Sequence, residues 1–126
     1  MGKNSNLITV TNQNKPGVQS PAVKYCASFL CLSRGLMFRK RLESDDGLLL
    51  VFGRESRIDS SITMFFVPFD LGVFWINTEM KVVDKVIAKA WKPAYVSAKP
   101  AQYVLEIHPE HWNNFEVGDT VEFEDA

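Results

Sequence analysis

The run Leu48-Leu49-Leu50-Val51-Phe52 is apolar at every position. A strand with one face in water alternates apolar and polar residues, whereas a run without polar residues predicts a strand buried on both faces. Turn signals bound this run on either side, with Asp45-Asp46-Gly47 before it and Gly53 after it. The stretch therefore predicts the central strand of a β-sheet.

Short segments rich in Val, Ile, Phe and Tyr lie on both sides of this run, which is typical of a mainly β protein. We expect a small barrel-like fold of about eight short strands, because closure would hide the strand edges. One short helix is expected within Ser28–Arg41, capped by Ser28 or Ser33, and another at Pro109–Phe115, which begins with proline. The expected strands are 7–11, 23–27, 47–52, 62–66, 71–76, 81–90, 102–107 and 120–123.

The composition of the 126-residue chain is that of an ordinary globular protein, and we expect a single domain over residues 1–126 with its core at about 7–123. The net charge of −1, from 14 basic and 15 acidic residues, argues against a bulk electrostatic attachment to nucleic acid or to a membrane. No segment reaches the roughly 20 apolar residues of a membrane helix. We expect neither a membrane nor a nucleic acid as partner.

Two features favour a cytoplasmic protein. The start of the chain, Met1–Asn6, leads into only a short apolar run and lacks the apolar core of a signal peptide. Cys26 and Cys31 are five residues apart and would face opposite sides of one straight strand. We therefore expect two small buried apolar side chains rather than a disulfide.

Glu106 stands within the otherwise apolar segment Tyr103-Val104-Leu105-Glu106-Ile107. A carboxylate in such a strand needs a partner. Arg34 and Arg39 are the obvious candidates, because a guanidinium can donate two hydrogen bonds to one carboxylate. Two interpretations stay open. Glu106 is either an internal anchor, paired with an arginine or with N–H groups of the Gly35 turn, or part of a polar pocket that binds an anionic or hydrogen-bonding ligand.

Large aromatic side chains are concentrated in the second half of the chain, and Phe65-Phe66-Val67-Pro68-Phe69 is too apolar for an ordinary exposed loop. They either fill the barrel or leave one face exposed as a surface for a partner or ligand. An exposed face would suit a homodimer or a binding groove. The cluster comprises Phe65, Phe66, Phe69, Phe74, Trp75, Trp91 and Tyr95.

Other signals of chemistry are weak. The basic residues Arg34, Arg39, Lys40 and Arg41 lie next to acidic ones, as at a solvated helix end. His108 and His111 have a spacing that can chelate a metal, but Pro109 lies between them and no third ligand is clustered nearby. No nucleophile motif or phosphate loop is present. We expect no metal, no cofactor and no catalytic residue.

Four short motifs resemble a family called the domain of unknown function 192, over residues from about Thr9 to Phe123. The residues that carry the resemblance are Gly35, Leu36, Met37 and Arg39; Ile62 to Phe66 with Trp91 and Pro93; Ala101 and Tyr103 to Glu106; and Gly118 with Asp119. The family has no established activity, so the resemblance implies an architecture and a grouping of residues but no chemistry.

The chain departs from the family pattern at the aspartate that ends the family's Pro-Ile-Asp motif. Gly72 stands where family members have that aspartate, and Asp70 lies two residues earlier, on the same face of a strand. Asp70 could replace the charge but not the position. A glycine at this point of a strand also predicts a bulge or a close approach of another backbone.

We therefore expect a non-catalytic cytoplasmic module that binds a small polar ligand or a protein. The alternative is a small enzyme that uses Glu106 or Asp119 as an acid–base group in a pocket beside the Arg34–Arg39 turn. The expected ligand-binding residues are Arg34, Arg39, Met64, Phe65, Phe69, Asp70, Trp91 and Glu106. The expected structural residues are Gly35, Met37, Tyr103, Gly118 and Asp119.

Overall fold

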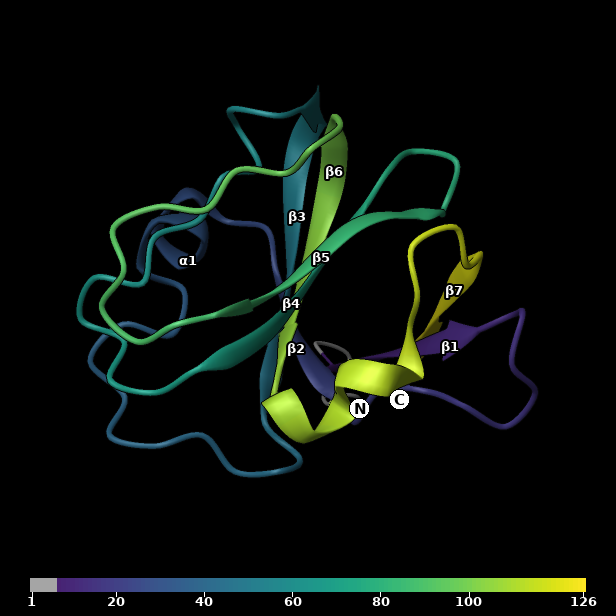
Figure 1. Cartoon of the computed structure of the whole chain (residues 1–126), viewed down its shortest axis with the longest axis horizontal. Coiled ribbons are helices and arrows are strands. Elements are labelled where there is room, and N and C mark those ends of the chain that lie inside the picture. The colour runs from purple at the N-terminus through teal and green to yellow at the C-terminus, as the bar shows by residue number, and fades with distance from the viewer. Residues whose placement is uncertain (1–6) are drawn as a thin grey trace.

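Seven strands form one antiparallel-rich sheet that is curled into a half-barrel, with two short helices, in a computed structural model that describes residues 7–126 (Figure 1). The mainly β, barrel-like fold expected from the sequence is confirmed. The strand order is β5-β4-β6-β3-β2-β1-β7. The elements are β1 (Leu7–Asn12), β2 (Val23–Cys26), α1 (Phe29–Arg34), β3 (Gly47–Ser56), β4 (Leu71–Ile76), β5 (Val82–Ala88), β6 (Ala101–Ile107), the 3₁₀-helix η2 (Pro109–Asn114) and β7 (Val121–Asp125).

The apolar run 48–52 lies in β3, at the centre of the sheet, as predicted. β3 pairs with β2 in parallel and with β6 in antiparallel orientation, so that Leu49 lies between Tyr25 and Leu105. Leu48, Leu49 and Leu50 are all buried. A strand with neighbours on both edges and apolar layers on both faces can use apolar side chains at each position.

The two faces of the sheet carry separate apolar clusters. On one face, Leu49, Phe74 and Leu105 pack with Phe115, which follows η2. On the other face, Leu50 and Val104 pack with residues of the long loops. The alternation along β6 therefore sends Leu105 to the first face and Glu106 to the second, beneath α1 and those loops.

The curl brings the two edge strands together at one end. Lys81 and Thr120 form an isolated bridge, the N–H of Val82 donates to the Asp119 carbonyl over 2.9 Å, and the N–H of Gly118 donates to the Val82 carbonyl over 2.7 Å. The strand edges are thus partly paired by the turn before β7, which reduces the exposed edge that an open sheet leaves.

The predicted strand at 62–66 is wrong. Only Ile62 pairs, in an isolated bridge with Tyr95, and the N–H of Met64 donates to the Lys92 carbonyl over 2.9 Å. Phe66 has a φ of +62°, which ends any extended conformation. The segment is a loop that pairs with the 91–95 loop, and only Ile62 and Met64 of its apolar residues are buried.

Both predicted helices are present, and the first is shorter than expected. Ser28 caps α1, where its hydroxyl accepts the N–H of Cys31 over 3.2 Å, and Gly35 ends the helix at a φ of +53°. Residues 35–38 form a turn, and residues 39–41 have no helical structure. The bulge or close approach predicted at Gly72 is also wrong, because β4 pairs regularly there and an added Cβ would find its neighbours at 3.5 Å or more.

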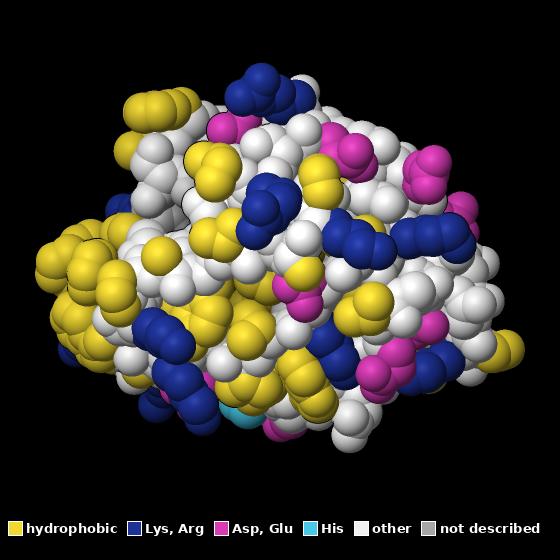
Figure 2. All heavy atoms as spheres, turned by 45° about the horizontal axis from the view of Figure 1, so that its top comes forward, with side chains coloured by type: hydrophobic (Ala, Val, Ile, Leu, Met, Phe, Trp, Pro, Cys, Tyr) yellow, Lys and Arg dark blue, Asp and Glu magenta, His cyan; other side chains and the backbone are white. Residues whose placement is uncertain are grey.

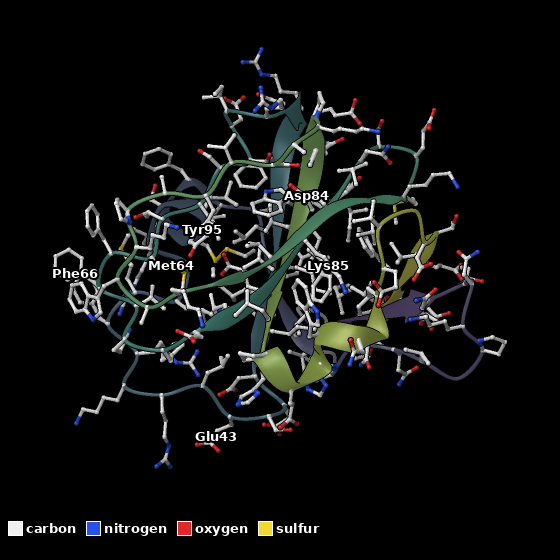
Figure 3. All side chains as sticks on the ribbon, in the orientation of Figure 1. Glu43, Met64, Phe66, Asp84, Lys85 and Tyr95 are labelled. Atoms are coloured by element: carbon white, nitrogen blue, oxygen red, sulfur yellow. A yellow bond between two sulfur atoms is a disulfide. The ribbon has the colours of Figure 1, made fainter. Side chains whose placement is uncertain are left out.

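Cys26 and Cys31 form a disulfide, so the prediction of two unpaired cysteines is wrong. The prediction assumed one straight strand. β2 ends at Cys26, and the chain then turns into α1, which brings the two Cα atoms to 5.6 Å, within the range for a disulfide (Figure 3).

The absence of a signal peptide was inferred from Met1–Asn6, which lie outside the described residues. None of the helices found from residue 7 to residue 126 has the length and apolarity needed to cross a membrane.

Candidate functional site

A cavity of about 280 Å³ lies between α1 with its following turn and the loop at 59–63. Its inner wall is apolar and includes Leu50, Val67 and Leu71. Polar side chains of the turn and of the loop lie around it, and three of them, Asp59, Ser61 and Thr63, were not predicted from the sequence as site residues. No local sequence signal marks these residues, because only the packing of the loop against α1 brings them to the cavity.

Glu106 is the one acidic residue of the sheet that lines this cavity among the residues described, and it is only 5 % exposed. On β6 it lies opposite Leu48 of β3 and Val73 of β4. Within residues 7–126, no hydrogen bond and no ion pair reaches its carboxylate. Buried polar groups normally have partners, so this carboxyl group is an exception that needs an explanation.

The environment of Glu106 changes its acidity. Burial raises the pKa of its carboxyl group from the ordinary 4.5 to about 7, because the apolar surroundings disfavour the charged form. At neutral pH the protonated and ionised forms are therefore both populated. The group can donate one hydrogen bond when it is protonated and only accept when it is ionised.

The turn after α1 forms one wall of the cavity. The N–H of Gly35 donates to the Cys31 carbonyl over 2.8 Å, and the N–H of Met37 donates to the Arg34 carbonyl over 3.0 Å. Leu36, between them, is buried, and it lines the cavity together with Arg34, Gly35 and Met37. The disulfide joins the same helix to β2, so α1 is held to the sheet on the side of the cavity.

The two arginines expected beside Glu106 are separated from each other. Arg39 forms an exposed ion pair with Asp46 at 3.1 Å and does not line the cavity. Arg34 lines the cavity, and its guanidinium lies 5.9 Å from the centre of the Phe38 ring. The arginine–Glu106 pair of the anchor interpretation is absent from the described residues.

Three exposed aromatic rings form a second feature, which we call the aromatic patch and define as Phe38, Phe66 and Trp91. Phe38 and Phe66 stack with their ring centres 5.0 Å apart, and Trp91 meets Phe66 edge-on at 5.4 Å. Trp91 was expected at a site from the sequence, whereas Phe38 was not singled out. Its place in the patch depends on a hydrogen bond between the N–H of Phe38 and the Phe66 carbonyl, at 2.8 Å.

The other residues expected at the site have varied positions. Met64 is fully buried and Phe69 packs against the core, whereas Phe65 is 48 % exposed (Figure 3 labels Met64). Asp70 accepts the N–H of Ala90 over 3.0 Å and pairs with Lys89 at 3.4 Å. It therefore connects β4 to the chain after β5 and does not line the cavity.

The remaining structural residues lie away from the cavity. Tyr103 faces the opposite side of the sheet and packs edge-on against Phe123 at 5.0 Å. Asp119 follows Gly118 in the turn before β7. Burial alone would raise the pKa of Asp119, but hydrogen bonds from the Glu116 N–H and the Asn12 amide lower it below its ordinary value. An acid that stays ionised outside the cavity does not fit the acid–base role.

No metal centre is found in the part of the chain that the structure describes, because no three His, Cys, Asp or Glu side chains gather there. His108 instead caps η2, and His111 connects η2 to the loop at Ser44. His108 Nδ1 accepts the N–H of Glu110 at 3.1 Å, and His111 Nε2 lies 2.7 Å from the Ser44 carbonyl.

The fold and the cavity together define a class of protein: a curled β half-barrel in which α1 and the loops enclose a buried acid on one face of the sheet. The sequence profile of the family named domain of unknown function 192, described as uncharacterized, matches residues 9–123. The chain belongs to this family.

The chain is also similar to other proteins in sequence and to solved structures in fold. The chain is 36 % identical over 97 residues to a UPF0127 protein of Thermococcus kodakarensis, a match that covers 77 % of this chain and 60 % of that protein, so it spans about three fifths of that relative's length. A protein of Sinorhizobium meliloti 1021, named as a candidate transcription regulator, has a similar structure with a TM-score of 0.80 and 19 % identity over 93 % of this chain and 92 % of that one.

A second similar structure is a protein of unknown function from Novosphingobium aromaticivorans. Its TM-score is 0.74 at 19 % identity, and the match covers 92 % of this chain and 83 % of that one. At such low identity these structures establish the fold only.

Proposed function

We propose that the chain is a non-catalytic binding protein whose ligand occupies the cavity above Glu106. The observation that carries the proposal is a carboxyl group that is 5 % exposed, lacks a hydrogen-bonding partner among residues 7–126 and lines a cavity of about 280 Å³. Leaving a buried carboxyl unsatisfied is unfavourable, and a ligand that donates a hydrogen bond to it would remove that penalty.

The lining specifies a class of ligand. The polar end of the ligand donates a hydrogen bond to Glu106. An ammonium group would bind most favourably there, because it would form an ion pair with the ionised carboxylate. Its apolar body packs against Leu50, Val67 and Leu71, while Ser61 and Thr63 offer hydroxyl groups near the outer part. Small-molecule sites commonly combine apolar walls with a few polar groups that fix orientation.

The proposal is tested with a series of n-alkylammonium ions from propyl to hexyl, by thermal shift and calorimetry. We expect binding to strengthen with chain length, as more apolar surface is buried, and to be tighter at pH 8 than at pH 5 because Glu106 is ionised at pH 8. The matched variant Glu106→Gln should lose the pH dependence and most of the affinity. Binding that is absent from the native protein, or equal in the variant, would contradict the proposal.

An enzyme that uses Glu106 as a general acid or base is the second candidate. The pKa of about 7 favours it, because efficient proton transfer needs a group whose pKa lies near the working pH. The two candidates differ in what happens to a bound compound. If the chain is a binding protein, NMR spectra recorded over many hours will show the compound chemically unchanged. Conversion of the compound by the native protein but not by Glu106→Gln would establish the enzyme.

The cytoplasmic location stays a prediction. The disulfide between Cys26 and Cys31 bears on it, because disulfides persist mainly in oxidising compartments. Mass spectrometry after thiol alkylation of the protein isolated from its own cells would decide between the cytoplasm and an oxidising compartment. Two alkylated cysteines would favour the cytoplasm, and a retained disulfide would favour an oxidising compartment.

A further inference from the structure

The aromatic patch lies at one end of the molecule, beyond the strands, and it is separate from the cavity that contains Glu106. In Figure 1 long loops extend past the sheet on the left, and Figure 3 places Phe66 at the outer limit of that end. Figure 2 shows hydrophobic side chains massed at the same end, with Lys and Arg side chains beside them. Phe38, Phe66 and Trp91 are 63 %, 47 % and 51 % exposed.

The backbone holds these rings outward against its own preference. Phe38, Phe66 and Trp91 have φ values of +68°, +62° and +68°. Only one other described residue that is not glycine, Met80, has a positive φ. Bulky residues rarely adopt this conformation, and such strained residues concentrate at functional sites.

Hydrogen bonds between loops maintain the arrangement. The N–H of Phe38 donates to the Phe66 carbonyl over 2.8 Å, and the N–H of Trp91 donates to the Val67 carbonyl over 3.2 Å. Three separate loops are therefore joined so that each presents one ring at the same surface. Burial of the rings does not explain this, because about half or more of each side chain remains in contact with water.

Cationic side chains border the patch. Arg39 and Lys40 line the shallow groove formed by its rings, and Arg34 lies over Phe38. Arg34, Lys40 and the neighbouring Lys92 form no ion pair within residues 7–126, although Arg39 pairs with Asp46. The surface thus combines exposed aromatic rings with free positive charges, although the whole chain carries a net charge of −1.

We propose that the aromatic patch docks the protein onto an anionic lipid membrane, with its rings at the level of the headgroups and its lysines and arginines on the lipid phosphates. Tryptophan and phenylalanine favour the membrane interface, and anionic lipids attract nearby basic side chains. Phe29 and Leu30, 86 % and 74 % exposed on α1, add apolar surface, and Leu30 lines a groove that also contains Arg39. The net-charge argument from the sequence concerned the whole chain and did not address a local patch.

The geometry favours a membrane over two other occupants. A single-stranded nucleic acid binds by stacking its bases on free ring faces, but Phe38 and Phe66 stack on each other, with 26° between their planes. A protein partner usually inserts an anchor side chain into a deep, well-packed pocket, whereas the groove between these rings is shallow. The mobile lipid surface requires no complementary shape.

The test is co-sedimentation of the full chain with vesicles of phosphatidylcholine alone and of phosphatidylcholine with phosphatidylglycerol in equal amounts. We expect the protein to pellet with the anionic vesicles, less with the neutral ones, and less as salt rises. The Phe38→Asn, Phe66→Asn, Trp91→Asn triple variant should bind at least about tenfold more weakly. Asparagine tolerates a positive φ better than an aromatic residue, so the variant should keep its fold.

Three controls make the result decisive. Ile58→Asn removes an exposed apolar side chain, 70 % exposed, that lies outside the patch, and should bind as the native protein does. Lys40→Gln and Lys92→Gln should each weaken binding roughly fivefold without affecting the apolar rings. These two variants test the proposal independently if the triple variant has a lowered melting temperature.

Several outcomes would overturn the proposal. They are the absence of native protein from the vesicle pellets, and equal pelleting of the native protein and the lysine variants. Binding of an oligothymidylate that is lost in the triple variant would assign the patch to nucleic acid instead. A dimer detected by analytical ultracentrifugation and lost in the triple variant would assign it to a second copy of the chain.

Discussion

Glu106 shows how one residue connects folding to pH. Its carboxyl group has a pKa of about 7 in the folded protein and about 4.5 in the unfolded chain. The folded state therefore binds the proton more tightly, and the free energy of unfolding falls as pH rises between those two values. The loss amounts to roughly 3 kcal/mol, since each pKa unit corresponds to about 1.4 kcal/mol.

Glu106→Gln should remove this loss. We expect the variant to be more stable than the native protein at pH 8, where the native carboxylate is ionised, and similar to it at pH 4, where both side chains are neutral. Urea unfolding across this pH range, taken as the difference between the two proteins, isolates the residue from all other acids. A variant less stable than the native protein at pH 8 would restore the anchor interpretation, in which an arginine pairs with Glu106.

Gly47 is required for a steric reason. A Cβ there would lie 2.6 Å from the Glu106 carbonyl oxygen and 2.8 Å from Cγ1 of Val23. Gly47→Ala should therefore destabilise the protein by about 1–3 kcal/mol. Gly53→Ala in the same strand is the matched control, because nothing lies within 4 Å of its added Cβ. Equal melting temperatures for the two variants would contradict the close packing of β3 on β6.

At the scale of elements, α1 depends on attachments outside itself. It has six residues, none of them buried, and a helix this short is not stable alone in water. The Ser28 cap at one end, the Gly35 turn at the other and the disulfide to β2 hold it in place. Since α1 forms one wall of the cavity, these attachments also determine the shape of the site.

The Cys26→Ser, Cys31→Ser double variant should lose about 2 kcal/mol of stability, the chain-entropy value for a closed loop of this size. We also expect faster amide hydrogen exchange at 28–35 than in β3, because the change acts on α1 rather than on the sheet. Reduction of the native protein should reproduce both effects. Exchange that rises uniformly along the chain would mean that the disulfide stabilises the whole fold instead.

For the whole molecule, the closure between β5 and β7 is the feature that converts a sheet into a half-barrel. Asn12 is only 1 % exposed, and its side-chain amide donates to both the Asn114 carbonyl and the Asp119 carboxylate, each at a distance of 2.8 Å. Asp119 also accepts the Glu116 N–H at 2.9 Å. The lowered pKa of Asp119 has the opposite effect on stability from that of Glu106, since its contribution is lost as the pH falls through its folded pKa.

Asp119→Ala should cost about 1–3 kcal/mol, because it leaves the buried Asn12 amide without one of its acceptors. We expect increased hydrogen exchange both at 81–83 and at 117–122, the two sides of the closure. Glu122→Ala, on the exposed part of β7, is the control and should change little. An effect confined to 117–122 would show that the two edge strands are stable independently.

The strands were predictable because the local pattern determines them. The range 71–76 was predicted with the bounds of β4, and the apolar run at 48–52 was placed correctly at the centre of the sheet. The predicted strand at 62–66 failed for a physical reason. Apolar β-branched and aromatic residues predict burial, but they do not distinguish a strand in a sheet from a loop packed beneath other loops.

The sequence by itself determined the class of fold, the central strand and the place of Glu106 in an otherwise apolar strand, because each depends on residue type and on neighbours within a few positions. Only the tertiary structure decided the disulfide, the separation of Arg34 from Arg39, the unpartnered state of Glu106 and the aromatic patch. These features depend on distances between segments far apart in the chain and on left-handed backbone at Phe38, Phe66 and Trp91. The spacing of residues along the chain predicts neither these distances nor these backbone conformations, since the packing of the loops determines both.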